Sequence, residues 1–241
     1  NTVGRSLTLR QQLLGRQVRG MLFLRLSDLF RQCRGDEILE LLRPDPLDDA
    51  EMSNWRRNRR LEYAQAQALL GLFADSGKTF AGTVVEDGQI IEVGAKTVTL
   101  RLVDDAGGES LRLLPLGNLP IKLVLFLARP KWTNTEPVDQ AAAALALWWG
   151  DFEVALSLTP EGEARRQIEE MATLCFQLQH DEIRAIAYAG NMALAAAKAR
   201  FFKSRYSWHS SYPRVQDEIS NLLRTVPAPR HLPPGGSPAA P

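Results

Sequence analysis

The chain has 241 residues, of which 45% are hydrophobic, so it can bury the core of one large domain or of two small ones. Its 29 basic and 28 acidic residues leave a net charge of +1, which excludes a protein drawn to nucleic acid or to an anionic membrane by its overall charge. Binding of either kind would have to depend on a local patch.

Other simple features exclude further classes. Cys33 and Cys175 lie far apart and match no metal-ligand spacing, so we expect two buried thiols. No apolar run reaches the roughly 18 residues that would span a bilayer. Because the chain begins with Asn1 and ends in a Pro-rich segment, we expect a piece of a longer protein. The sequence does not identify its compartment, for which the cytoplasm is favoured.

Residues 1–76 are predicted to form an N-terminal helical region. The first 26 residues allow either two strands that meet near Gly15 or a helical arm, and we favour the arm. Ser27 is expected to cap a new short helix, and a second short helix is expected to stop at Pro44. One long helix should follow from Ala50 to Ala74, because its apolar residues fall near one face. The apolar face of the arm would carry Leu9, Leu13, Leu14 and Val18.

Residues 77–132 are predicted to form a small antiparallel β unit, because the period of the apolar residues changes to two after Phe80. Four or five short strands result, and they must curl into a barrel or pack on the flanking helices to bury a face. Residues 121–128 allow a last strand or a buried helical turn. The alternating apolar residues are Val98, Leu100 and Leu102 on one strand and Leu111 and Leu113 on its partner.

Residues 133–226 are predicted to form a C-terminal helical bundle, and residues 227–241 a disordered Pro-rich tail. A helix that contains Trp148 and Trp149 should break at Gly150, and Thr159-Pro160 should begin a long helix through Gln179. The fold class is therefore α+β: predominantly helical, with a central small antiparallel β barrel or sheet of four to five strands.

A further long helix is expected from Asp181 to about Phe202, with Leu194 and Ala197 on its buried stripe. The last helix of the bundle should lie within "SSYPRVQDEISNLLRTV". His180, between the two long helices, is expected to cap or end one of them.

The β unit resembles a known family. "TFAGTVVE" and "KTVTLRLVDDAGGESLRLLPLGNLP", within residues 78–120, resemble the SLA-homology module of endocytic adaptors, an SH3-like small barrel. The resemblance implies such a barrel and a general binding role, since adaptor members bind short peptides through the barrel surface. It assigns no individual binding residue. The matching parts are Phe80 to Glu86, Val98 to Arg101, Gly107-Gly108 and Leu114 to Leu119.

Signatures of catalysis are absent from the sequence. It contains no nucleophile elbow, no zinc-protease motif, no Walker loop and no dinucleotide-binding glycine motif. Three histidines, His180, His209 and His231, leave little material for acid/base chemistry. We therefore expect no enzyme, no metal site and no cofactor.

The segment 198–212 is the first candidate for a binding surface. Its cations alternate with aromatic rings, which suits contacts with bases and phosphates, but equally a helix end whose rings fill a core. The candidate interaction residues here are Phe201, Phe202, Arg205, Tyr206 and Trp208.

Two further clusters are candidates. Neighbours on a helix diverge by about 100°, so Trp148 and Trp149 should not both point inward. One of them is expected to reach the barrel or a partner.

The arginines of the second cluster could bind an anion as a set, or form a solvated helix face that pairs with the acids upstream. They are Arg56, Arg57, Arg59 and Arg60.

These features favour a non-enzymatic protein-interaction or scaffold module, whose partner is another protein or another part of the parent chain. That hypothesis predicts no cluster of perturbed titratable groups. The alternative is a nucleic-acid-binding module that uses the Arg-rich N-terminal region and the segment 198–212 together on one face. A second alternative is an enzyme of unfamiliar type. The sequence does not determine the oligomeric state.

Overall fold

The computed structural model describes residues 2–75, 82, 84–85, 88–94, 96–103, 107–132 and 137–225. The chain divides into two units, Asn1–Cys175 and Phe176–Pro241, and each is described by itself. Helices dominate, and a small antiparallel sheet lies in the first unit, so the helix-rich α+β class is confirmed. None of the described helices is long and apolar enough to cross a membrane. The predicted Pro-rich tail lies outside the described residues.

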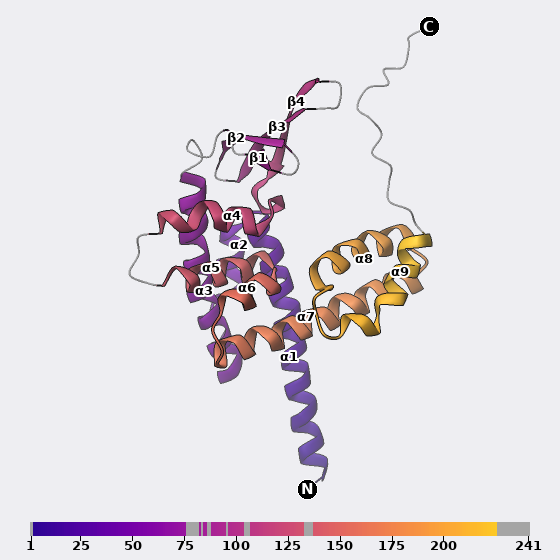
Figure 1. The fold of residues 1–241 in the computed structure, drawn as a ribbon. Coiled ribbons are helices and arrows are strands. Elements are labelled where there is room, and N and C mark those ends of the chain that lie inside the picture. The colour runs from indigo at the N-terminus through magenta and orange to yellow at the C-terminus, as the bar shows by residue number, and fades with distance from the viewer. Residues whose placement is uncertain are drawn as a thin grey trace. The chain divides into compact units, whose positions relative to one another are not determined.

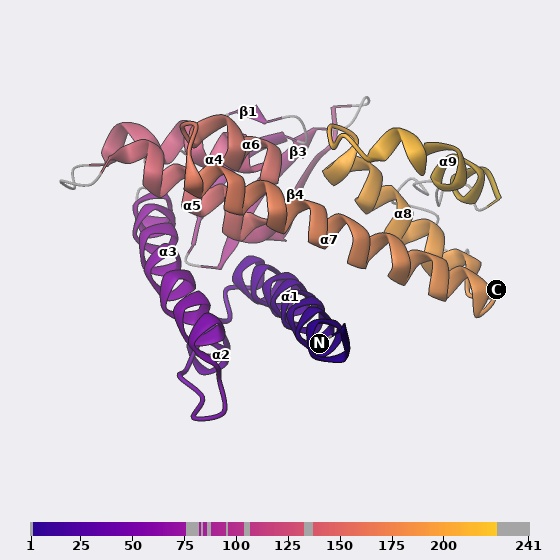
Figure 2. The same cartoon turned by 90° about the horizontal axis from the view of Figure 1, so that it is seen from below.

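The first unit packs its helices around α5 (Figures 1 and 2). Every residue from Ala141 to Gly150 is buried, because α5 packs against α1, α3, α4 and α6. The indole of Trp148 lies among Phe23, Phe30 and Tyr63, with ring centroids 5.3 to 6.2 Å apart. The helices of this unit are α1 (Thr2–Arg31), α2 (Gly35–Leu41), α3 (Ala50–Asp75), α4 (Ile121–Ala128), α5 (Val138–Trp149), α6 (Phe152–Leu158) and the first part of α7 (Glu163–Tyr188).

The expected helical arm is confirmed, but the new helix at Ser27 is not. α1 is continuous from Thr2 to Arg31, and Ser27 lies inside it, buried. Phe23, Leu26 and Phe30 recur at helical spacing across Ser27 and are all buried, so packing of this face overrides the capping preference of the serine. α3 confirms the long helix predicted from Ala50.

The β unit is a sheet with strand order β1-β2-β3-β4, in which every neighbouring pair is antiparallel. Its inner face buries Ile90, Val93, Val98 and Leu100, whereas Leu102 is only half-buried. β1 has only two residues, so three longer strands make up most of the sheet. The strands are β1 (Val84–Val85), β2 (Gly88–Val93), β3 (Thr97–Val103) and β4 (Glu109–Pro115).

The segment 121–128, which allowed a strand or a helix, is the helix α4. Ile121, Val124, Leu125 and Ala128 are buried on one side of it, at the spacing of a helix face. Short 3-10 turns, η2 (Leu116–Asn118) and η3 (Arg129–Lys131), precede and follow it. The described part of the sheet therefore ends at β4.

Two predicted helix boundaries in the C-terminal half are wrong. Thr159 ends α6 instead of starting a helix, and its hydroxyl donates to the Ala155 carbonyl (2.8 Å). α7 runs without a break through Gln179 and His180, so His180 neither caps nor ends a helix. The predicted break at Gly150, by contrast, is confirmed, since this glycine ends α5 in the left-handed region at φ 79°.

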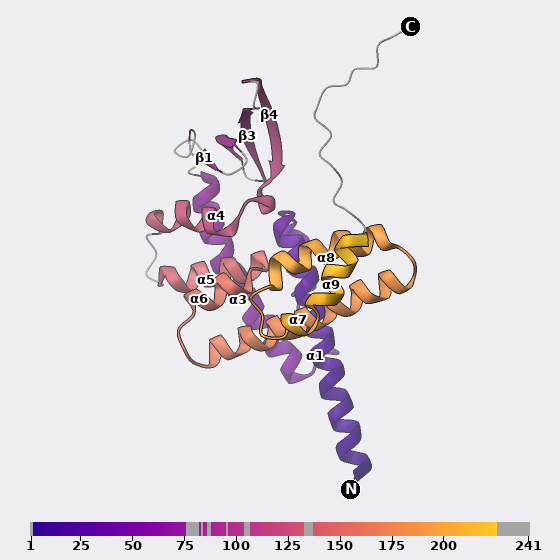
Figure 3. The same ribbon diagram turned by 45° about the vertical axis from the view of Figure 1, so that its right-hand side comes forward.

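The second unit contains the last turns of α7, α8 (Met192–Tyr206), η4 (Tyr212–Arg214) and α9 (Gln216–Thr225) (Figure 3). α8 starts after Gly190 (φ 83°), with Asn191 as its N-cap. This break lies inside the helix predicted from Asp181, so a different set of residues faces the core after it. Leu194 and Ala197 are exposed, contrary to prediction. The residues of α8 that are buried instead are Ala195, Ala196, Ala199, Phe202 and Tyr206.

Candidate functional site

The tryptophan pair lies in the core of the first unit. Trp148 is 0% and Trp149 is 6% exposed, so the expectation that both could not be buried is wrong. The reason is that α5 is enclosed on all sides, which leaves no outward face for either indole. Trp149 does reach a second element, since its Nε1–H donates to the Leu119 carbonyl after β4 (3.1 Å). The pair joins the helices to the end of the sheet and offers no free surface.

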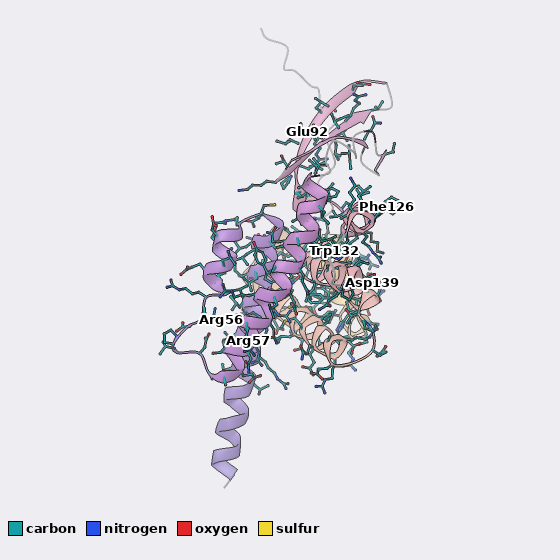
Figure 4. All side chains as sticks on the ribbon, turned by 90° about the vertical axis from the view of Figure 1, so that its left-hand side faces the viewer. Arg56, Arg57, Glu92, Phe126, Trp132 and Asp139 are labelled. Atoms are coloured by element: carbon teal, nitrogen blue, oxygen red, sulfur yellow. The ribbon has the colours of Figure 1, made fainter. Side chains whose placement is uncertain are left out.

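The four arginines of α3 fall into two pairs. Arg56 bonds to Asp48 through Nε (2.7 Å) and to the Leu41 carbonyl, which ties α3 to the preceding loop and to the end of α2. Figure 4 shows where Arg56 and Arg57 lie on α3. Arg59 is buried and forms an ion pair with Glu62 (2.6 Å). The other two, Arg57 and Arg60, are exposed. The structure therefore does not bring the four guanidinium groups together as one anion site.

The segment 198–212, with its cations and aromatic rings, also contains both buried and exposed side chains. Phe202 and Tyr206 are fully buried, whereas Phe201 is 42% exposed and the Arg205 guanidinium lies over its ring, 4.4 Å from the centroid. Trp208 is half-buried, and its Nε1–H donates to the Arg205 carbonyl (2.7 Å). His209, also in this segment, is buried. The exposed aromatic surface of the segment 198–212 therefore consists mainly of Phe201.

Some perturbed titratable groups of the first unit lie near one another: burial raises the pKa of the Tyr63 hydroxyl, and the nearby Asp36 and Cys33 raise it further. Burial raises the pKa of the Glu62 carboxyl, which the neighbouring Arg59 only partly opposes. Burial lowers the pKa of His209, whose ring stacks on Phe176 in the second unit. Burial also raises the pKa of the Cys33 thiol, which makes its reactive thiolate scarcer. Within the described residues, no group of three or more His, Cys, Asp or Glu side chains could hold a metal ion.

The open edge of the sheet was not predicted. The hydrogen bond from the Leu116 N–H to the Lys96 carbonyl (2.8 Å) shows which residues of β4 face β3. The register continues as Thr99 opposite Leu113 and Arg101 opposite Leu111. Because alternate residues of an antiparallel strand direct their N–H and C=O groups to opposite sides, the even-numbered residues of β4 bond to β3. Leu111 and Leu113 direct theirs away from it, and no described strand pairs on that side.

Pro115 fits the same geometry. It is an odd-numbered residue, so its missing N–H falls on the open side, where a proline costs no bond within the sheet. Among the residues that the structure describes, the outer edge of β4 is thus blocked by Pro115 at one end and unpaired over Leu111 and Leu113.

The side chains next to this edge are apolar and exposed. Leu111 is 70% and Leu113 66% exposed, and Val103 on the same face of β3 is 63% exposed. An ion pair between Arg101 and Glu109 (3.8 Å) lies between these apolar positions. Exposed apolar side chains, beside backbone groups that no described strand pairs, are the two features of a strand that can accept another strand.

We call Leu111, Leu113 and Val103, together with the open backbone of β4, the β4 edge surface. Sequence reasoning identified its strands but placed Leu111 and Leu113 simply as the return of a hairpin. The signal that could have found it is Pro115, because a proline within a strand indicates an edge.

Comparisons with protein-family models, with curated proteins and with solved structures found no match to this chain.

Proposed function

We propose that this chain is a non-catalytic protein-interaction module that binds an extended segment of a partner protein by adding it as a strand to β4. The observation that carries the proposal is the β4 edge surface, in which outward backbone groups lie beside leucine side chains 66% and 70% exposed. Main-chain hydrogen bonds would supply affinity, and the leucines would select a partner strand with apolar residues at alternate positions.

The resemblance to the SLA-homology module supports this proposal, because adaptor members of that family bind short peptides through their barrel surface. We propose that the four strands belong to an SH3-like barrel of this kind. Such a barrel would have to leave β4 unpaired on its outer side. The scaffold would then be the helices around α5, which hold the end of the sheet through the hydrogen bond from Trp149 to Leu119.

The test is a selection of random peptides displayed on phage against the full chain, followed by binding measurements on proline variants. Leu113→Pro removes one outward N–H, so we expect it to remain folded and to weaken the selected peptides about tenfold or more. Leu114→Pro is the matched fold control, because it removes an N–H that bonds to β3 and should lower the melting temperature.

A second control separates strand addition from mere apolar contact. Phe126 on α4 is 74% exposed, so Phe126→Ser removes a comparable apolar surface away from β4 and should leave binding unchanged (Figure 4). Peptides that bind equally well to wild type and to Leu113→Pro would contradict the proposal. Should Leu113→Pro fail to fold, Leu111→Arg/Leu113→Arg tests the same surface through its side chains.

Nucleic-acid binding is a second candidate, and one observation favours it. Residues 1–34 contain seven arginines and one acid, a net charge of 7 − 1 = +6. The described aromatic residues favour it less, since Phe202 and Tyr206 are buried and cannot stack on bases. Binding of a fluorescent single-stranded oligonucleotide at two salt concentrations tests it, because phosphate contacts weaken steeply with salt.

A further inference from the structure

The described side chains of helix α1 change from unburied to buried along the helix. From Gly20 onward it repeatedly buries residues against the rest of the first unit, whereas none of residues 13–19 is buried. The first anchor is the ion pair between Arg19 and Glu51 (2.6 Å). In Figures 1 and 4 the N-terminal half extends past the other elements of this unit. Because none of the described side chains from Leu13 to Arg19 is buried, packing adds little stability to this stretch, and an isolated helix is only marginally stable by itself.

Helix α1 has an exposed apolar stripe. Leu14, Val18 and Met21 are 60%, 45% and 54% exposed, and their spacing of i, i+4 and i+7 places them on one face. Phe23, which is fully buried, follows Leu14 by nine residues, so at about 100° per residue it lies on the opposite face. The stripe therefore points away from the body of the unit. We call Leu14, Val18 and Met21 the α1 outer stripe.

As far as Ser27 the charged residues of α1 are all basic, and the first acid is Asp28, three residues after Arg25. Residues 1–27 contain five arginines and no acid. Arg10 precedes Leu14 by four residues and Arg25 follows Met21 by four, so the helical spacing continues from an arginine at one end to an arginine at the other. Pairing two copies of α1 would bring like charges together, which disfavours a second copy as the occupant.

We propose that the α1 outer stripe docks an acidic amphipathic helix of a partner protein. Three apolar residues in a narrow seam suit the packing of one helix against another, and the stripe lacks the aromatic residues typical of a helix that lies on a membrane. The two arginines are 15 residues apart, which is about 22 Å along a helix at about 1.5 Å per residue. The partner helix carries acids at a matching distance, on either side of its own apolar seam. This surface does not involve β4.

The probe is a synthetic helical peptide with leucines at three seam positions and a glutamate one turn beyond each end, labelled for fluorescence anisotropy. Its control is the same peptide with lysines in place of the glutamates. We expect the glutamate peptide to bind the full chain about tenfold more tightly than the lysine peptide, since two charge pairs change sign. Arg10→Glu/Arg25→Glu should reverse this preference, and Val18→Asp should abolish binding of both peptides.

Three results would overturn the proposal. The first is equal binding of the two peptides or binding of neither. The second is concentration-dependent self-association that Val18→Asp removes, which would identify a second copy as the occupant. The third is capture of the chain by phosphatidylserine vesicles through Val18 and Met21, with no preference between the peptides. Because Val18 and Arg25 are exposed, their variants should keep the wild-type melting temperature.

Discussion

Neighbouring phenylalanines in α8 should respond oppositely to the same substitution. Phe202 is fully buried, with its ring centroid 4.9 Å from that of Phe176 and 5.1 Å from that of Tyr206. Phe201 is 42% exposed and contacts the Arg205 guanidinium. Phe202→Ala should therefore leave a cavity, whereas Phe201→Ala removes a ring that is partly exposed and should leave none.

The expected magnitudes differ widely. Truncating a buried phenylalanine costs about 3–5 kcal/mol in free energy of unfolding, against roughly 0.5–1 kcal/mol for an exposed cation–π contact. The 50 residues from 176 to 225 should have a total stability of about 2.5–7.5 kcal/mol, at about 0.05–0.15 kcal/mol per residue. Phe202→Ala thus removes most of the stability of the second unit.

Hydrogen exchange measured on peptides from α8 and α9, with circular dichroism for the melting temperature, follows this unit directly. We expect fast exchange throughout both helices in Phe202→Ala and nearly wild-type exchange in Phe201→Ala. Equal loss of protection in both variants, or a greater loss in Phe201→Ala, would show that α8 buries another face and would refute the reasoning.

Three further predictions concern single groups. His209 accepts a hydrogen bond from the Ser211 N–H through Nδ1 (3.2 Å), and burial lowers its pKa. The second unit should therefore keep full stability above about pH 6.5 and lose at most about 1.4 kcal/mol per pH unit below it, a trend that denaturation of His209→Phe should lack. Gly117→Ala would place a Cβ 2.2 Å from the Arg31 carbonyl oxygen, so it should lower stability by about 1–3 kcal/mol in thermal melts, whereas exposed Asn118→Ala should not. Trp149→Phe leaves a buried carbonyl unpaired and should cost about 1–3 kcal/mol in urea unfolding.

The sequence by itself determined most of the helices and the extended β unit, but it left residues 1–26 and 121–128 open between strand and helix. The long helix from Ala50, the break at Gly150 and the hairpin of β3 and β4 were all predicted. These are local properties, because the period of apolar residues and the conformational freedom of glycine act over a few neighbouring positions. The predicted helix starts at Ser27 and Thr159 failed, since capping is a weak local preference that packing overrides.

Only the tertiary structure decided which side of each element is covered. Trp148 and Trp149 are both buried because α5 has neighbours on every side, and Phe202 is buried while Phe201 is not because the break at Gly190 sets the phase of α8. The same holds for the open edge of β4, since a strand is an edge only when no other strand lies beside it. Burial depends on what surrounds a residue in space, and that is a property of the whole fold, not of the segment that contains it.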